Sequence, residues 1–436
     1  MATRVRVGLL GCGNVGGALA RLLTEDGVRI AARTGLALEL RKVAVRSQSR
    51  ERDVVMSPSL LTTDAASVVA DADIDVIVEV IGGIEPARTL ILEALKSGKP
   101  VVTANKELLA NCGDELFEAA SSAGVDLLFE AAVAGGIPLI RPLRESLAGE
   151  AIYRVMGIVN GTTNFILTRM AESGTSYHDA LAEAQSLGYA ERDPTADVEG
   201  YDAAAKAAIL ANVAFGARVV AGDVYREGIS GLTGADIAMA GKLGYVVKLL
   251  AVVEHDGGSG DDPRETVAVR VHPAMVPVTH PLASVRDSFN AVFVEGRAVG
   301  QLMFLGRGAG GMPTASAVLG DLLDAAHNLT TGGAGRTVAL RRTAIRPIDD
   351  LRSAYYLHLE VEDRPGVLHA ISGVLGAHRV SIRLMEQETL VGGLSTARLV
   401  FVTHPALESD VQACLGELRH LEVVRQVGGL LRVIGS

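Results

Sequence analysis

The stretch Val5–Leu23, VRVGLLGCGNVGGALARLL, decides the fold of this chain. Its beginning is apolar and predicts a buried strand, whereas its end predicts a helix. Between them lies Gly11–Gly16, which has the pattern G-x-G-x-x-G. That pattern is typical of a dinucleotide site when it follows a strand and opens a helix, as it does here. The stretch therefore predicts a Rossmann-type domain at the N-terminal end of the chain.

The residues of this loop have separate roles in such a site. Gly11 permits the tight turn, Gly13 lets a pyrophosphate approach the backbone, and Gly16 permits close packing of helix on strand. Asn14 and Val15 lie at the helix N-terminus, where free amides and the helix dipole attract phosphate. We expect all five residues to contact the cofactor.

The end of the second predicted strand, Leu38–Val45, points to the identity of that cofactor. An acidic residue commonly stands there to hold the ribose 2′-hydroxyl of NAD. Here the position is Arg46, with Arg50 and Arg52 close behind. A guanidinium suits a 2′-phosphate, so NADP is favoured over NAD. The alternative is a solvated basic turn.

Alternation of strands and helices continues to about residue 150 and predicts an α/β domain with a parallel sheet over residues 1–150. Strands are expected at 75–81, 100–103 and 125–129, with a helix at 86–96. Lys106 follows a strand, and open α/β sheets build their sites at carboxyl strand ends. Glu130 precedes the glycine-containing turn Ala132–Pro138, which suits either a hard cation or a tight helix start. The residues alone favour the helix start.

Residues 151–327 have a different pattern and predict a second, α+β domain. Strands are expected at 152–159, 267–271, 291–295 and 301–305, and Asn160 is expected to cap a helix through Met170. Asn160 or Thr163 is also a candidate for contact with nicotinamide or substrate. A second glycine-rich loop, Gly306–Thr314, precedes a helix at 315–327 and is another place for backbone to approach a cofactor.

The stretch Gly188–Lys206 contains the strongest catalytic candidate of the second domain. An Ala-rich run over 203–214 predicts a helix that places Asp202 and Lys206 four residues apart on one face. The neighbouring residues Ala207–Ala211 leave no polar face, so the helix is expected to be buried. A buried lysine needs a partner, because an unpaired one would lose its charge. The alternative is a simple Asp–Lys helix pair beside a solvated acidic loop.

The remainder is predicted as a linker, residues 328–350, and a separate C-terminal unit, residues 351–436. The linker is rich in Gly and Arg and lacks periodicity. The strand and helix patterns after it follow the order βαββαβ, which predicts a ferredoxin-like fold.

The composition excludes several classes of partner. The chain has 436 residues, 48% of them hydrophobic, and a formal net charge of −10. This balance disfavours nucleic acid and anionic membranes as partners. No uncharged apolar run is long enough to span a bilayer. The three cysteines lie far apart without ligand spacing, which indicates reduced thiols in a cytoplasmic protein.

Three segments together resemble homoserine dehydrogenase. They are Thr103–Lys106 (TANK), Gly157–Leu167 (GIVNGTTNFIL) and Glu191–Lys206, and the resemblance covers about residues 4–326. The segment Asp363–Val367 (DRPGV) lies in a unit similar to an ACT domain, a module that often binds amino acids. The resemblance implies reversible oxidation of L-homoserine to L-aspartate 4-semialdehyde with NAD(P), in the synthesis of threonine, methionine and isoleucine. It also implies a homodimer or homotetramer and an amino-acid effector, of which L-threonine is the first candidate.

The resemblance also implies roles for individual residues. Lys206 would be the catalytic proton donor, assisted by Lys106, which with Thr103 and Gly310 also lies near the cofactor. The substrate would be bound by Glu191, Asp202 and Gly188. A Na⁺ site would be formed by Glu130 and the backbone carbonyls of Val133, Gly135 and Ile137. For this last loop the resemblance favours the cation over the helix start.

Two other functions remain open at this stage. One is another NAD(P)-dependent oxidoreductase of amino-acid metabolism with an amino-acid-sensing ACT domain. The other is an amino-acid sensor whose catalytic half has lost activity. Intact Lys106, Lys206 and glycine loop argue against the sensor.

Overall fold

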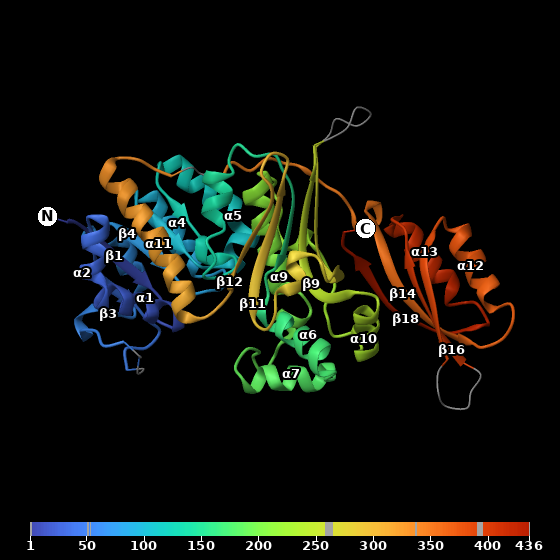
Figure 1. The fold of residues 1–436 in the computed structure, drawn as a ribbon. Helices are drawn as coiled ribbons and strands as arrows, with labels where there is room; N and C mark the ends of the chain where they lie inside the picture. Colours follow the sequence, from blue (N-terminus) through green and yellow to red (C-terminus); the bar gives the residue numbers. More distant parts are fainter. Residues whose placement is uncertain are drawn as a thin grey trace.

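The computed structural model describes residues 2–49, 52, 54–257, 265–335, 338–389 and 396–435. Figure 1 shows an elongated chain, with the N-terminal sheet at one end, a second sheet in the middle and the C-terminal unit at the other end. The fold class predicted from the sequence is confirmed in each of these three parts. None of the helices among these residues is long and apolar enough to cross a membrane.

The N-terminal sheet has six parallel strands in the order β3-β2-β1-β4-β5-β6. This is the doubly wound order, in which sites form at the carboxyl strand ends where the order reverses, here between β1 and β4. The strands are β1 Thr3–Leu10, β2 Leu36–Ala44, β3 Leu61–Thr62, β4 Val76–Glu79, β5 Val101–Thr103 and β6 Leu127–Leu128. The helices are α1 Asn14–Glu25, α2 Gly27–Thr34, α3 Ala65–Ala70, α4 Ala87–Lys96 and α5 Lys106–Ala123.

Helix α11 (Gly311–Thr331) packs on this first sheet although it follows the second sheet in the chain. Its buried Ala315, Val318 and Leu322 share a core with Val7 and Leu9 of β1. Figure 1 shows α11, in orange, beside the blue strands and α1. The glycine-rich loop before α11 is thereby brought to the glycine-rich loop before α1.

The second sheet continues from the middle part of the chain into the C-terminal unit, in the order β12-β11-β7-β9-β10-β18-β14-β16-β15. Its first strands are β7 Ile152–Ile158, β9 Tyr245–Asp256, β10 Thr266–Pro277, β11 Phe289–Gly296 and β12 Gly300–Arg307, with short β8 Tyr225–Arg226 and β13 Ala344–Ile345 on β10. Strand β9 is not among the predicted strands. Its sequence YVVKLLAVV is apolar without alternation, because it is buried on both faces of the sheet.

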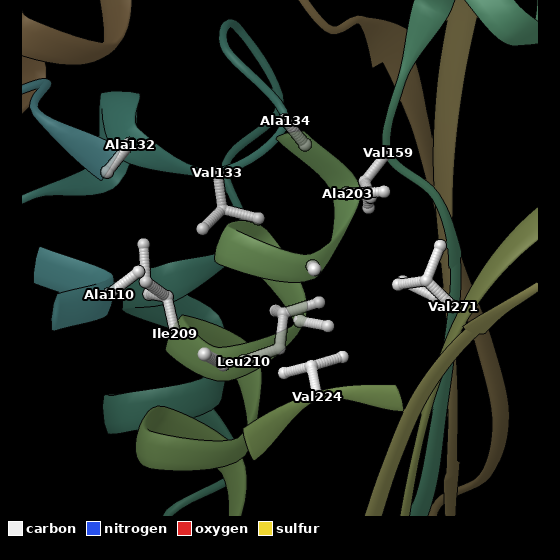
Figure 2. Packing of buried hydrophobic residues seen from close by; sticks show 14 of the residues in the cluster. Ala110, Ala132, Val133, Ala134, Val159, Ala203, Ile209, Leu210, Val224 and Val271 are labelled. Atoms are coloured by element: carbon white, nitrogen blue, oxygen red, sulfur yellow. The ribbon is translucent and has the colours of Figure 1, made fainter. Parts of the chain in front are cut away.

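The helices of the middle part are α6 Gly161–Ser173, α7 Tyr177–Ser186, α8 Thr195–Val198, α9 Tyr201–Phe215 and α10 Gly234–Lys242. Helix α9 is buried, as predicted, and lies between the first domain and the second sheet. In Figure 2 its Ile209 and Leu210 point in different directions, toward Ala110 of α5 and toward Val224. Alanines between these larger residues let neighbouring backbones approach closely, so α9 is tightly packed and holds Lys206 in a fixed position.

The C-terminal unit has the predicted βαββαβ order. It comprises β14 Arg352–Glu362, α12 Val367–Ala377, β15 Ile382–Thr389, β16 Thr396–Thr403, β17 Ala406–Leu407, α13 Glu408–Leu418 and β18 Val424–Val433. Within it, β14 pairs antiparallel with both β18 and β16. Its edge strand β18 also pairs with β10, through Ala274 with Arg432 and Met275 with Val433. The unit is therefore attached to the catalytic half by backbone hydrogen bonds.

Described residues of the segment 328–350 bind to the catalytic half in several places. The amide of Asn328 donates to Asp126 at 2.9 Å, and the backbone N–H of Gly335 donates to the same carboxylate. The backbone of Arg341 donates to the Gly216 carbonyl at 2.7 Å. Strand β13 then pairs with β10. The proposed linker thus follows the surface of the preceding domain.

Candidate functional site

The glycine loop after β1 has the geometry that a dinucleotide requires. Gly11 has φ +99°, and a Cβ there would lie 2.8 Å from the Val80 carbonyl oxygen. A Cβ on Gly16 would lie 2.1 Å from the Gly11 carbonyl oxygen, so only glycine fits. Gly13, by contrast, has no heavy atom within 4 Å of the same position. It faces open space, where phosphates could approach.

Two helix N-termini meet at this loop. Helix α1 begins at Asn14, followed by Val15, and its cap residue Gly13 supplies no side-chain hydrogen bond. Helix α11 begins after Gly310, which has φ +117° and also supplies none. A Cβ on Gly311 would lie 2.8 Å from the Asn14 carbonyl oxygen, so the two loops are in close contact. Uncapped amides from both helices suit an anionic ligand.

Among the described residues of the basic turn after β2, one arginine is exposed. Arg46 is exposed directly beyond the strand end. Arg52 is used within the turn, where it donates to the Ser47 carbonyl and, at 3.2 Å, to the Gln48 carbonyl. Arg50 lies outside the described residues. Of the two arginines described, Arg46 is the one available to a ribose phosphate.

The Thr103 side chain, predicted to lie near the cofactor, is used within the protein. Its hydroxyl donates to Glu79 Oε2 at 2.6 Å, and both residues are fully buried. The other oxygen of Glu79 accepts the amide of Ile81 at 2.7 Å. The pair therefore fixes the carboxyl ends of β4 and β5. If Thr103 contacts the cofactor, it does so through its backbone, because its hydroxyl is already bonded to Glu79.

Lys106, Asp202 and Lys206 form the centre of the site. Lys206 Nζ donates to Asp202 Oδ2 at 2.7 Å and to the Val159 carbonyl at 2.7 Å. Lys106, at the start of α5, pairs with the other oxygen of Asp202. The Lys206 side chain is 11% exposed and that of Lys106 is 45% exposed. One carboxylate thus holds a buried and an accessible ammonium together.

Electrostatics make the two lysines unequal. Burial lowers the pKa of Lys206 below its ordinary value, despite the opposing attraction of Asp202. Burial also acts to lower the pKa of Lys106, but Asp202 outweighs it and the net shift is upward. Burial alone would raise the pKa of Asp202, yet the two lysines hold it well below its usual range. Lys206 is therefore the better proton donor of the two.

Asn160 caps helix α6 and also hydrogen-bonds to Asp202 of the lysine cluster. The predicted helix cap and the predicted place in the site are therefore compatible. Its Oδ1 accepts the Thr163 amide at 2.9 Å, which starts α6. Its Nδ2 donates to Asp202 at 2.9 Å and to Asp197 at 2.7 Å. The sequence placed Asp197 only in an acidic loop. Its meeting with Asn160 depends on the fold of α8, which the sequence did not predict.

The sequence of this chain is similar to known proteins over nearly its whole length. The sequence families described as homoserine dehydrogenase, its NAD-binding domain and the ACT domain match residues 138–323, 11–130 and 355–422. The homoserine dehydrogenase of Corynebacterium glutamicum is 51% identical over 98% of this chain and 95% of its own length. This chain belongs to the homoserine dehydrogenase family. It is an NAD-binding oxidoreductase, and nothing in these comparisons supports the other amino-acid oxidoreductase.

Further relatives within the family cover nearly all or three quarters of this chain. A homoserine dehydrogenase of Mycobacterium tuberculosis is 50% identical over 99% of this chain and 98% of its own. A crystal structure from Thiobacillus denitrificans has a TM-score of 0.91 at 41% identity and covers 99% and 98% of the two chains. A hyperthermophilic archaeal mutant in complex with NADPH has a TM-score of 0.61 at 30% identity and covers 75% and 98%.

The expected substrate residues Glu191 and Gly188 lie in the exposed loop between α7 and α8. Gly188 has φ +76°, which favours glycine. The loop is held to α6, because Thr162 donates to the Tyr189 carbonyl at 2.8 Å. No described residue forms an ion pair or hydrogen bond with the Glu191 carboxylate. It is therefore the acidic group of this loop with capacity for a ligand ammonium.

The loop after Glu130 contacts the second glycine-rich loop. Glu130 is buried and accepts the backbone amides of Leu139, Ile140 and Arg141. A Cβ on Gly135 would lie 2.3 Å from the Gly308 carbonyl oxygen. Glu130 therefore caps the helical segment that follows Pro138. This is the role that the residues alone favoured.

The same loop also has the donor atoms for a hard cation. In the described structure its turn bonds use the carbonyls of Ala134 and Arg307, rather than those of Val133, Gly135 or Ile137. These three oxygens, with the lone pairs left on Glu130, match the oxygen ligands of Na⁺ and Ca²⁺ in kind. The described residues contain no cluster of three or more His, Cys, Asp or Glu suited to a metal. Any cation here would depend on backbone oxygens.

Proposed function

We propose that the chain interconverts L-homoserine and L-aspartate 4-semialdehyde, with Lys206 as the proton donor and acceptor. The observation that carries this proposal is the Lys106–Asp202–Lys206 cluster, at the carboxyl ends of the N-terminal sheet and beside a glycine loop built for a dinucleotide. Family membership supports the substrate pair. Homoserine-dependent reduction of NADP, followed by absorbance, tests it directly. Absence of turnover with homoserine and turnover with another amino acid would contradict it.

In this mechanism the protein stabilises charge and moves one proton. A bound nicotinamide supplies the hydride acceptor or donor. In the direction of reduction, negative charge develops on the aldehyde oxygen, and the Lys206 ammonium stabilises it and then gives it a proton. Asp202 keeps Lys206 oriented, and Asn160 fixes the second lone pair of the same carboxylate oxygen. Lys106 is more exposed than Lys206, which supports a contact of Lys106 with both substrate and cofactor.

Substrate recognition follows from the charges that surround the cluster. Homoserine carries an ammonium and a carboxylate. We propose that Glu191 and Asp202 hold the ammonium, with the Gly188 backbone as a further contact, and that Lys106 faces the carboxylate. The exposed position of Glu191 supports this role, since its carboxylate is not used by the described protein.

Arg46 is proposed to set a preference for NADP. Arg46→Asp is expected to raise KM for NADP far more than KM for NAD, because a repulsive carboxylate replaces a donor to the 2′-phosphate. Steady-state kinetics with both cofactors measures this. Arg52→Lys is the comparison, since Arg52 is used by its own turn. Equal effects of Arg46→Asp on both cofactors would show that its side chain points elsewhere.

We further propose that Na⁺ is held by Glu130 and the carbonyls of Val133, Gly135 and Ile137. The unused carbonyl oxygens support this. The ion would fix this loop against the second glycine-rich loop, and so would act on cofactor binding rather than on the proton transfer.

The ACT unit is proposed to bind an amino-acid effector, with L-threonine as the first candidate. Gly366 has φ +94° and opens α12 without a side-chain cap, so the first amides of the helix are available to a carboxylate. Full-length enzyme is expected to lose activity as threonine is added, and to a greater extent than a chain that ends near Asp350 and lacks the ACT unit. If calorimetry shows that full-length protein binds no threonine, isoleucine or methionine, the unit has a structural role.

The assembly and location are proposals of the same kind. Edge strand β12 and its neighbour leave Phe289 and Leu305 38% and 56% exposed, which supports pairing with a second copy in a homodimer or homotetramer. Three free cysteines support a cytoplasmic enzyme. The reaction would serve threonine, methionine and isoleucine synthesis.

A further inference from the structure

A hollow of about 420 Å³ lies between α6, α10 and the start of β9. Much of its lining is apolar and includes Ile237, Val246 and Val278. Three charged residues also line it: Glu172, Lys248 and Arg286. An apolar cavity of this size with a few convergent polar groups is typical of a small-molecule site. None of these residues takes part in the mechanism above.

Lys248 is the most informative residue of the hollow. It is 4% exposed, and its Nζ donates to Asn164 Oδ1 at 3.0 Å and to the Val285 carbonyl at 2.5 Å. An ammonium has three N–H donors, so one remains. No carboxylate of the described chain forms an ion pair with it, and burial lowers its pKa to about 8. Glu172 and Asp287 attract this cation without contacting it, so the carboxylate of a ligand in the hollow would stabilise it by accepting its remaining N–H.

The other two charged residues pair with each other at the more exposed side of the hollow. Arg286 Nε lies 2.5 Å from Glu172 Oε1, with side chains 63% and 36% exposed. The hollow therefore offers a buried cation at Lys248 and an exposed pair with both signs of charge. A ligand with a carboxylate and an ammonium on one carbon matches this set, and the apolar lining suits a short side chain.

We propose that this hollow binds a small α-amino acid, with its carboxylate on Lys248 and its ammonium on Glu172. The site is separate from the Gly366 turn of the ACT unit. It rests on the geometry of the hollow and not on the identity of the substrate.

The hollow is connected to the C-terminal unit through α10 and the start of β9. Tyr245 lines the hollow, and its hydroxyl accepts a hydrogen bond from Arg383 of β15 at 2.7 Å. On α10, which forms one wall, Asp236 lies 3.1 Å from His358 Nδ1 of β14. A ligand that moved this wall would shift the contact between the two units.

The hollow is also connected to the catalytic centre through α6. Lys248 holds Asn164 in the first turn of that helix, and the cap of the same helix is Asn160, which donates to Asp202. This second connection uses hydrogen bonds between buried side chains. Occupancy of the hollow is therefore expected to change the apparent affinity for substrate, by about 5- to 150-fold for a typical allosteric coupling.

Calorimetry on the full-length protein tests the site, with L-threonine, L-valine and 1-amino-2-propanol as probes. The two amino acids are expected to bind, and the amine, which lacks the carboxylate, is not. Lys248→Met is expected to weaken amino-acid binding at least about 10-fold, the loss of one charged hydrogen bond in a buried place. Because the assay needs no turnover, its outcome is independent of the proposed reaction.

A second variant tests the site independently, in case Lys248→Met does not fold. Gly241 is exposed on α10, lines the hollow, and has no atom within 4 Å of a Cβ. Gly241→Leu fills the hollow while improving helix propensity, so it is expected to fold and to lose the binding event. Gly234→Leu, on the same helix outside the hollow, is the matched control and is expected to keep it.

A binding event that disappears in Gly241→Leu and persists in Gly234→Leu and in Asp363→Asn of the ACT turn supports the site. Absence of amino-acid binding in the unchanged protein overturns it. So does amino-acid binding that, in the Asp363→Asn background, survives both Gly241→Leu and Lys248→Met.

Discussion

Lys206→Met is expected to lower kcat by at least about 10²-fold, the lower end of the contribution of a general acid. The fold is expected to persist, because Asp202 keeps Lys106 and Asn160 as partners when the Lys206 ammonium is removed. KM for the cofactor should change little, since Lys206 is buried behind Lys106. Steady-state kinetics and circular dichroism measure these effects. A near-normal kcat in Lys206→Met would contradict the assignment of Lys206 as the proton donor.

Two further variants separate proton transfer from charge. Lys206→Arg retains a cation that gives up no proton, so a kcat as low as that of Lys206→Met would identify proton transfer as the lost step. Lys96→Met, at the exposed end of α4, is the control for the loss of a lysine and should leave kcat unchanged.

The pH dependence of the wild-type reaction gives an independent check. Alcohol oxidation needs neutral Lys206 to accept the proton, so the rate should rise as pH passes the pKa of Lys206. Burial places that pKa below the ordinary lysine value. This rise should be absent in Lys206→Met.

Arg432→Met is expected to lower the free energy of unfolding of the C-terminal unit by about 3–5 kcal/mol, as breaking a buried ion pair does. Arg432 is 2% exposed and donates to Glu408 at 2.9 Å and, across the junction with the catalytic half, to Glu227 at 2.8 Å. Its loss leaves Glu408, 1% exposed, with a hydroxyl from Tyr355 but no cation. Urea unfolding followed by hydrogen exchange in β14 and β18 measures the change.

The same strand supplies a matched control. Arg425→Met removes an exposed arginine from β18 and should change stability by less than about 0.5 kcal/mol. The double variant Arg432→Met with Glu408→Leu should recover part of the loss, since an apolar pair replaces the buried charges. A loss in Arg432→Met no larger than that in Arg425→Met would show that the charges at this junction do not hold the unit in place.

The sequence by itself determined those features that depend on local spacing. Gly11, Gly13 and Gly16 need only the strand before them and the helix after them, and a four-residue interval is enough to join Asp202 to Lys206. The βαββαβ order of the C-terminal unit is likewise carried by consecutive segments. Local patterns also placed Lys106 at a carboxyl strand end and Glu191 in the acidic loop before α9, but only the family resemblance gave these two residues roles beside Lys206.

Only the tertiary structure decided which distant groups meet. Lys106 and Asp202 lie 96 residues apart and are joined because α5 and α9 pack together. The Thr103 hydroxyl donates to Glu79 because β4 and β5 are neighbours in the sheet. The Lys248 cation is buried beside a hollow because β9 and α10 form there, where neither was predicted. The attachment of β18 to β10 also lies beyond sequence patterns. Spacing along a chain specifies local geometry, whereas burial and pairing depend on long-range packing.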